Sequence, residues 1–424
     1  MTDQLHGSPA GVPQAPATAP DAQCSGPQDE TSTAMMAVWG NPEMSANPQP
    51  MHQRLRAQGD TLRMGPMVML NTRAAVDEAL HRPEIFSSGM SSARLGNTRP
   101  LIPMQIDPPD HRAYRKLLDP LFGPKQIARL EPVLVEVVGR LIDGFAERGS
   151  CDFTEEFATP LPCSVFLALL GLPPEDLAAL VRMKGAIVHP PRHDIAETER
   201  VQNAAGQELY DYFARALDAP RQVEGGLLAR LLAADIDGRA LTRDEIVDIC
   251  YLLVLAGLDT ITDTLTLGLV FLARNPEHRQ AIVDDPELIP AAIEELLRWE
   301  SPIPGVPRTV TAQTSVAGCP VAPGDLLYIG LGAANTDPAT LPDAYSVRFD
   351  REPNRHLAFG GGIHRCLGAR LARLELRIAL REWHRRIPHY ALPDGVELQY
   401  LTGLRSVEHL PLIFPPSNRR AEMC

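Results

Sequence analysis

From about residue 110 onward, apolar side chains recur at the three-to-four-residue spacing of amphipathic helices. This pattern predicts helices over residues 111–122, 125–149, 159–172, 196–219, 242–273, 289–299 and 366–387. The clearest start signal is a capping box, in which Thr242 is followed three residues later by Glu245. The helix that it opens is predicted to run unbroken to Ala273, over roughly 45–50 Å. Since that helix is apolar on most faces, we expect it in the middle of a large domain.

The pattern changes at residues 309–338, where β-branched residues alternate with polar ones between glycines and prolines. Such a segment is typical of short strands and turns. The predicted fold class is therefore mainly α with a minor β region. Residues 1–34 are rich in Pro, Ala, Gln, Ser and Thr. They bury too little apolar surface to offset the entropy of ordering, so we predict a disordered segment followed by a single domain over residues 35–424.

Composition narrows the class of protein. The 424 residues are 44% hydrophobic and 22% charged, as in ordinary globular enzymes. The net charge of −13 argues against nucleic-acid binding, which needs a basic surface. The cysteines are scattered without a C-x-x-C pair, which opposes a structural zinc site and fits a reducing cytosol. With no signal-peptide pattern and no apolar run of about 18 residues, we expect a cytoplasmic protein without a membrane span.

Residues 359–368 read FGGGIHRCLG and place Cys366 where a glycine-rich turn meets the start of a predicted helix. Unpaired N–H groups and the helix dipole stabilise a thiolate at such a position. The cysteine could be a nucleophile with His364 as its base. It could also be a zinc ligand, although zinc needs more ligands than Cys366 and His364, the two that this neighbourhood supplies. It could also be a haem ligand, because one axial thiolate suffices and glycines let a flat macrocycle approach. A buried cysteine in a tight turn is the remaining alternative, and the loop by itself favours haem.

Three further patterns bear on this choice. Asp259 and Thr260 follow Gly257 inside an apolar helix, where an ionisable group is costly unless it is paired, hydrated or used. A helix kink in which Thr260 bonds its own backbone is the alternative. Glu295 and Arg298 lie three residues apart and can form an ion pair on one helix face.

The third pattern is a pair of cationic donors. His111 and Arg115 lie four residues apart, so one helix face presents both of them, and such a pair suits a carboxylate. Solvated surface charges are the alternative interpretation for the ion pair and for these donors.

Taken together, FGGGIHRCLG, EELLR and AGLDT in this order resemble the motifs of the cytochrome P450 family of haem-thiolate monooxygenases. The resemblance implies a helical body around a long central helix with a small β-sheet subdomain. It implies haem b as cofactor and O2 as co-substrate, with one oxygen atom inserted into a lipophilic small molecule such as a fatty acid, terpenoid or steroid. A peroxide-driven oxidation, a rearrangement, a reduction and a non-catalytic haem sensor remain alternatives.

The resemblance also implies roles for individual residues. Cys366 is expected to be the axial metal ligand, and Asp259 with Thr260 the acid–alcohol pair that passes protons. Glu295 and Arg298 form the structural E-x-x-R pair, with Arg348 as its expected third member and Arg351 as the alternative. The expected cofactor-binding residues are His111, Arg115, Ala256, Gly257, Arg308, His356, Phe359, Gly360, His364, Cys366 and Gly368. The expected substrate pocket is lined by Leu252, Leu255, Ala256, Ile303, Gly305 and Val306.

Partners follow from the same resemblance. No flavin or iron–sulfur motif accompanies the catalytic pattern, so we expect electrons from a separate ferredoxin or flavodoxin with an NAD(P)H-dependent reductase. The hypothetical docking surface consists of Arg112, Lys116, Arg365 and Arg373. Residues 91–105 have the polarity and Gly/Pro content of a lid, in which Arg94 or Arg99 is hypothesised to meet a substrate carboxylate.

Overall fold

The computed structural model describes residues 42–416 except 93–94, 191–194, 219–225 and 402–403. The predicted disordered segment, residues 1–34, lies outside this range. The helices are α2 (Pro42–Ala46), α3 (Pro48–Arg56), α4 (Arg73–Leu80), α5 (His111–Leu118), α6 (Pro124–Ile127), α7 (Glu131–Asp143), α8 (Pro160–Leu170), α9 (Leu177–Val188), α10 (Ile195–Asp218), α11 (Leu227–Leu232), α12 (Arg243–Gly257), α13 (Asp259–Arg274), α14 (Pro276–Asp284), α15 (Ile289–Glu300), α16 (Leu331–Asn335) and α17 (Ala369–Arg386).

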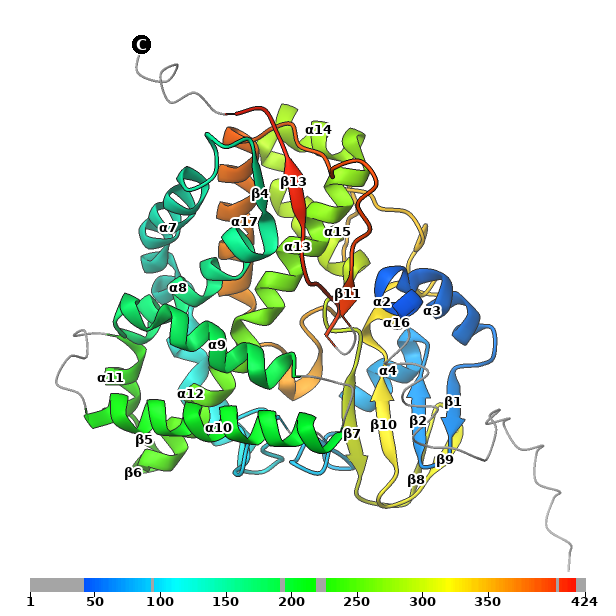
Figure 1. Cartoon of the computed structure of the whole chain (residues 1–424). Helices are drawn as coiled ribbons and strands as arrows, with labels where there is room; N and C mark the ends of the chain where they lie inside the picture. Colours follow the sequence, from blue (N-terminus) through cyan, green and yellow to red (C-terminus); the bar gives the residue numbers. More distant parts are fainter. Residues whose placement is uncertain (1–41, 93–94, 191–194, 219–225, 402–403, 417–424) are drawn as a thin grey trace, which may run out of the picture.

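The β structure is small, and its largest sheet lies at one side of the helical body (Figure 1). Its largest sheet has the order β1-β2-β10-β7-β3, in which β10 runs parallel to β2 and the other pairs are antiparallel. The fold class predicted from the sequence, mainly α with a minor β region, is therefore confirmed. The strands are β1 (Thr61–Met64), β2 (Met67–Leu70), β3 (Phe86–Ser87), β4 (Ser150–Asp152), β5 (Asp235–Ile236), β6 (Arg239–Ala240), β7 (Val306–Val310), β8 (Thr314–Val316), β9 (Cys319–Val321), β10 (Leu326–Ile329), β11 (Tyr400–Leu401), β12 (Ser406–Val407) and β13 (Pro411–Ile413).

The long central helix is broken, contrary to the prediction of an unbroken segment. The capping box is confirmed, since the Thr242 hydroxyl accepts the Glu245 N–H and the Glu245 carboxylate accepts the Thr242 N–H. The helix then stops at Gly257 and restarts at Asp259, with Leu258 between them at φ −97° and ψ −60°. The Thr260 hydroxyl donates to the Ala256 carbonyl at 2.8 Å, so a side chain supplies a hydrogen bond at the break.

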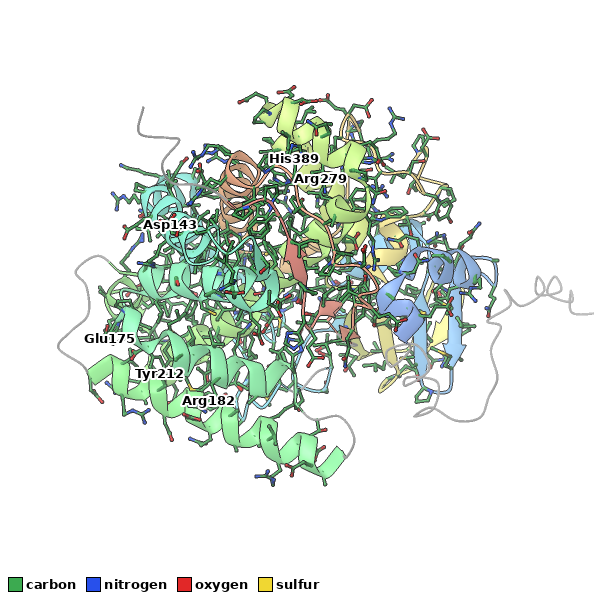
Figure 2. All side chains as sticks on the ribbon, turned by 45° about the horizontal axis from the view of Figure 1, so that its top comes forward. Asp143, Glu175, Arg182, Tyr212, Arg279 and His389 are labelled. Carbon is green, nitrogen blue, oxygen red and sulfur yellow. The ribbon has the colours of Figure 1, made fainter. Side chains whose placement is uncertain are left out.

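Helices α9 and α10 pack side by side, and both contact α12 (Figure 1). Tyr212 of α10 donates its hydroxyl hydrogen to Asp176, which precedes α9, at 2.8 Å. Arg182 of α9 pairs with Glu208 of α10, and Figure 2 shows Arg182 and Tyr212 on these helices. These contacts hold α9 in a fixed orientation, which matters because α9 carries a buried lysine toward the break in the central helix.

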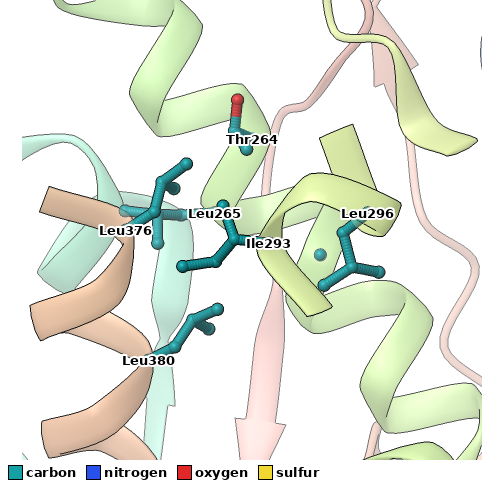
Figure 3. A pocket seen from close by; sticks show the side chains of 7 residues that line it. Thr264, Leu265, Ile293, Leu296, Leu376 and Leu380 are labelled. Carbon is teal, nitrogen blue, oxygen red and sulfur yellow. The ribbon is translucent and has the colours of Figure 1, made fainter. Parts of the chain in front are cut away.

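A small apolar cavity of about 10 Å³ lies in the core between α13, α15 and α17 (Figure 3). Gly268 lies at its wall, and a Cβ placed on Gly268 would meet Leu296 Cδ1 at 3.6 Å, an ordinary van der Waals contact. Gly268→Ala is therefore expected to stabilise the protein by about 0.5–1 kcal/mol, because alanine orders at lower entropic cost in a helix. Thermal unfolding checks this as a rise in Tm of roughly 1–3 °C.

Gly206→Ala is the matched control for that substitution. A Cβ at Gly206 would lie 2.2 Å from the Gly96 carbonyl oxygen, which is too close for any atom pair. Because backbone must move to make room, this variant is expected to lose at least about 1–3 kcal/mol. A Tm for Gly268→Ala at or below that of the parent would contradict the cavity argument.

Candidate functional site

The cysteine loop is shaped by its glycines. Gly360 and Gly362 have φ of +65° and +63°, in the left-handed region that favours glycine. A Cβ at Gly362 would lie 2.1 Å from the Leu80 carbonyl oxygen at the end of α4, so this glycine is required by contact. A Cβ at Gly360 would meet nothing within 4 Å. Gly360 therefore leaves open space beside the loop, as a flat ligand would need.

Cys366 lies at the end of this loop, just before α17. Its N–H donates to the Phe359 carbonyl at 2.9 Å, which closes the turn. The side chain is solvent-accessible, yet protein surrounds it closely enough that desolvation raises the pKa of the thiol. The Gly368 N–H and the charges of Arg115, Arg373 and Arg365 act in the opposite direction and favour the thiolate. These donors suit a sulfur that is deprotonated by binding a metal.

Ala256 and Gly257 are exposed, although Val254, Leu255 and Leu258 around them are buried. This patch lies at the break in the central helix, and a Cβ at Gly257 would meet nothing within 4 Å. Thr260 is half-buried beside it. The break thus presents small residues and one hydroxyl to open space.

Imidazole and guanidinium groups gather near the cysteine loop. The rings of His111 and His364 lie 4.4 Å apart, and His364 Nε2 is 3.1 Å from the Ser88 hydroxyl. Burial and the nearby charge of Arg308 lower the pKa of His364 to about 3, so its ring is neutral. Burial, and then Arg115, also lower the pKa of His111. Both imidazoles can donate hydrogen bonds without carrying charge.

These groups have unused donors. Among the described residues, His111 Nε2 is buried without a hydrogen-bond partner. Within the same part of the chain, the Arg308 guanidinium donates one hydrogen bond, to the Pro307 carbonyl at 2.7 Å, and burial lowers its pKa to about 10. Arg115 is bound to the Arg365 carbonyl and to Asp119, each at 2.8 Å. A half-buried guanidinium with further N–H groups to donate and a buried imidazole nitrogen without an acceptor fit an anionic ligand, such as the carboxylates of haem.

His356 differs from the other predicted propionate partners. Its Nε2 lies 3.1 Å from Glu294 and its Nδ1 accepts the Ala358 N–H at 3.1 Å, so both nitrogens are engaged within the protein. Glu294 also binds Arg373 through two contacts of 2.7 Å, and Arg373 lies over the Phe359 ring at 4.4 Å. Glu294 was missed from the sequence, although its position beside Glu295 in EELLR was a possible signal.

The E-x-x-R pair is fully buried. Arg298 donates to both oxygens of Glu295, at 2.7 and 2.8 Å, and to the carbonyls of Asn335, Ala344 and Ser346. Every direction of the guanidinium is thus satisfied, which is what a buried charge requires. This arrangement excludes the alternative that Glu295 and Arg298 form a solvated surface pair.

The third member of this network is Arg351, which corrects the prediction of Arg348. The Arg351 guanidinium lies 3.0 Å from Glu295, and its side chain is 7% exposed. Arg348 contributes only its backbone N–H to Glu295, at 2.9 Å. Its side chain turns outward to Asp343 and Asp350, because those two carboxylates attract it at the surface. Asn354 adds a further hydrogen bond to Glu295 at 3.0 Å.

Asp259 lies on the buried side of the break. It is paired with Lys184 of α9, and His189 Nε2 is 3.5 Å from the same oxygen. Burial alone would raise the pKa of Asp259, but the contact with His189 and the charge of Lys184 outweigh it and hold the pKa below its ordinary value. Lys184 and His189 were missed from the sequence, because nothing local relates α9 to the central helix.

The predicted substrate residues do not form one group. Leu252 and Leu255 are buried in the main hydrophobic core, whereas Ile303 and Val306 pack against the cluster beside the sheet. A Cβ at Gly305 would lie 2.3 Å from the Tyr328 ring, so this glycine permits close packing. Their assignment to a substrate pocket stays a prediction.

Of the two arginines in the predicted lid, the structure describes Arg99. Arg99 pairs with Asp248 of α12 at 2.9 Å and lies over the Tyr210 ring at 4.7 Å. Its charge is therefore already matched by a carboxylate of the protein. Arg94 lies outside the described residues.

The fold and this site together define a haem-thiolate class of protein. Cys366 lies on a glycine loop with open space beside Gly360, imidazole and guanidinium groups that can bind an anion lie near it, and a broken helix carries an acid and an alcohol. These residues fit a haem with Cys366 as its axial ligand.

Comparisons with known proteins agree with this class. Residues 195–383 match the family model described as Cytochrome P450. A steroid C26-monooxygenase of Mycolicibacterium smegmatis is 34% identical over 82% of this chain and 87% of that protein. A vitamin D(3) 25-hydroxylase of Pseudonocardia autotrophica is 32% identical over 87% of this chain and 94% of that protein. The chain belongs to the cytochrome P450 family, and it is a P450 monooxygenase.

Solved structures agree as well. A mutant of P450 EryK in complex with erythromycin B superimposes with a TM-score of 0.81 and 31% identity, over 89% of this chain and 98% of that chain. CYP109E1 from Bacillus megaterium in complex with corticosterone gives a TM-score of 0.80 and 29% identity, over 88% and 99%. In the described part of this chain, no helix combines the length and apolar character needed to cross a bilayer.

Proposed function

We propose that this P450 hydroxylates a lipophilic, steroid-sized molecule, using O2 and electrons from a separate ferredoxin or flavodoxin and its NAD(P)H-dependent reductase. The names of the relatives support the substrate class, since they include a steroid C26-monooxygenase and a vitamin D(3) 25-hydroxylase. The observation that carries the oxygen-dependent reaction is the Asp259–Thr260 pair at the break between α12 and α13. A peroxide-driven enzyme has no need of this pair.

In this proposal Cys366 holds the iron, while His111, Arg115 and Arg308 bind the propionates. When bound, haem supplies the activation of O2 and the oxidation of the substrate. The chain supplies position and protons: Thr260 presents its hydroxyl at the open side of the break, and Asp259 holds a carboxylate on the buried side. Proton delivery to an otherwise dry site is the step that such a pair serves. Ala256 and Gly257 leave room for the reactants beside it.

The test compares three ways of driving the enzyme. Purified protein is incubated with corticosterone or vitamin D3, and product is measured by mass spectrometry. We expect product with NAD(P)H, a surrogate ferredoxin and its reductase, and at least about tenfold less with peroxide alone. A substrate-induced spin-state shift identifies which compound binds. Turnover with peroxide that equals turnover with the reductase system would overturn the oxygen-dependent assignment.

The electron donor is proposed to dock on the basic surface near the cysteine loop. Arg112, Lys116 and Arg365 are exposed there, whereas Arg373 is already paired with Glu294. Charge complementarity of this kind raises the association rate and weakens with salt. Arg112→Glu is expected to slow reduction by an acidic ferredoxin about tenfold at low ionic strength. Stopped-flow kinetics of reduction measures this rate.

Arg54→Glu serves as the control for the docking surface. Arg54 is exposed on α3, outside the basic surface, and its substitution changes the net charge by the same amount. We expect it to leave the reduction rate within about twofold of the parent. Equal rates for Arg112→Glu and Arg54→Glu at low salt would remove the docking assignment.

A further inference from the structure

A second buried carboxyl group lies one helical turn beyond Asp259. Asp263 is four residues further along α13, so the two side chains share a helix face. Asp263 is 1% exposed, and among the described residues neither of its oxygens accepts a hydrogen bond of ordinary length and angle. The Oδ2 of Asp259 is likewise buried and unpartnered within that part of the chain. The proposed function explains Asp259 and gives no role to Asp263.

The groups around this pair come from several elements. Lys184 of α9 and His189, which follows α9, contact Asp259 from one side. The Ser406 side chain of β12 is directed at Asp263 as a hydrogen-bond donor, which partly favours the charged form of this carboxyl group. Cys163 of α8 interacts electrostatically with Lys184, Asp259 and Glu375 of α17. Burial raises the pKa of Glu375 well above its ordinary value. Lys184 is therefore the one fixed cation among these groups, facing two aspartates.

One buried lysine balances one carboxylate. If both aspartates were ionised, the second negative charge would be buried without a partner, which is strongly unfavourable. Two adjacent carboxyl groups resolve this conflict by keeping one proton between them. Because Asp259 is paired with Lys184, Asp259 is the ionised member of the pair and Asp263 carries the proton. Burial, and then the charge of Asp259, accordingly raise the pKa of Asp263 to about 7.

We propose that Asp259 and Asp263 share one proton, with Asp263 as the neutral carboxylic acid held in reserve beside Asp259. The inference rests on the proposed function, in which Asp259 takes part in proton delivery. In the step itself, the O–H bond of Asp263 breaks and an O–H bond forms at Asp259 Oδ2, so the pair keeps a single negative charge. Asp263 is reprotonated from water, and His189, with 25% of its side chain exposed, is the member of the cluster nearest to solvent. Asp263 is thus a positioning residue that acts through Asp259.

Infrared spectroscopy of the purified holoprotein tests this directly. A buried protonated carboxyl group gives a C=O stretching band that disappears when the proton leaves. We expect a band that is lost between about pH 5 and about pH 9 in the parent protein and that is missing at every pH from Asp263→Asn. Glu375→Gln is the matched control, since it removes another buried carboxyl group and is expected to keep the pH-dependent band of Asp263. A pH-dependent band that remains in Asp263→Asn, or the absence of any such band, overturns the proposal.

The pH dependence of stability is a second readout that needs no catalytic activity. The pKa of Asp263 is raised in the folded protein, so the unfolded chain releases this proton first. Stability therefore falls as pH rises from about 4 toward 7, and stays lowered above the folded pKa. Asp263→Asn lacks this loss, so its Tm is expected to exceed that of the parent by more at about pH 8 than at about pH 5. Parallel Tm profiles for the two proteins would contradict the shared proton.

Turnover separates this inference from the proposed function. We expect Asp263→Asn to retain the thiolate-haem spectrum and substrate binding, while the fraction of NAD(P)H consumption that yields product falls about tenfold. Asp263→Glu, which restores an acid, is expected to recover coupling. If the thiolate spectrum is missing from the parent protein, the proposed function fails, and the infrared band still decides whether the proton is shared. If coupling is unchanged in Asp263→Asn, the reserve-acid role fails while the P450 assignment stands.

Discussion

Replacing Cys366 by alanine is expected to abolish the red-shifted Soret band that a thiolate-ligated iron gives after reduction and treatment with carbon monoxide. The physical reason is that, in the proposed function, this sulfur supplies the one protein bond to the metal, in a loop whose donors are arranged around it. Even residues that only contact a metal ligand commonly change affinity or activity 10–100-fold, so loss of the ligand itself is expected to cost more than about 100-fold in turnover. Absorbance spectroscopy and the steroid turnover assay measure both effects.

Cys151→Ala is the control for this prediction. Cys151 is buried in β4, where desolvation raises the pKa of its thiol to about 12, so it is a structural thiol rather than a ligand. Its substitution is expected to leave the thiolate band intact. The assignment of Cys366 fails if Cys366→Ala keeps the band, and the same is true if Cys151→Ala loses it.

The parts of this site that were predictable from the sequence are local in the chain. The cysteine loop combines glycines, histidine and cysteine within ten residues, and the structure places that loop at the start of α17 as expected. The Glu295–Arg298 pair is set by helix geometry, so its contact followed from a spacing of three residues. The capping box at Thr242 is a third example, since both of its hydrogen bonds lie within one turn.

What was missed depends on contacts between distant segments. Lys184 reaches Asp259 across 75 residues, and the periodicity of α9 does not say which helix its buried face meets. Arg348 and Arg351 both precede the cysteine loop, and only the path of the chain decides which guanidinium turns inward. Strands β1 and β2 are four residues each, with an arginine in β1 and only apolar residues in β2, so neither shows a clear alternation of apolar and polar positions.

The break at Leu258 was missed for a different reason. Gly257, Asp259 and Thr260 all have low helix preference, so the sequence indicates a weakened helix at this point. Low preference alone does not predict that the helix ends there. The Thr260 hydroxyl that bonds the Ala256 carbonyl was considered as an alternative, and it is present in the structure. From the sequence alone, a glycine at a helix break therefore cannot be distinguished from a glycine that a continuous helix tolerates.

Glu295→Gln is expected to destabilise the fold by about 3–5 kcal/mol, a large share of the roughly 5–15 kcal/mol that holds a typical protein together. Glu295 accepts hydrogen bonds from Arg298, Arg351 and Asn354 in a site where its side chain has no exposed surface. Removing its charge leaves two guanidinium groups buried together without a counterion. Urea unfolding measures the loss as a lower midpoint, and the haem content of the purified protein is expected to fall with it.

The corrected assignment of the third residue makes a sharper comparison, because the two arginines are close in sequence and differ in burial. Arg351 is 7% exposed and bound to Glu295, whereas the Arg348 side chain is 46% exposed and bound to surface carboxylates. Arg351→Ala is therefore expected to cost about 2–4 kcal/mol. Arg348→Ala removes surface ion pairs and keeps the backbone N–H that Glu295 uses, so its cost is expected to stay below about 1 kcal/mol. Equal losses in the two variants, or a larger loss for Arg348→Ala, would return the third position to Arg348.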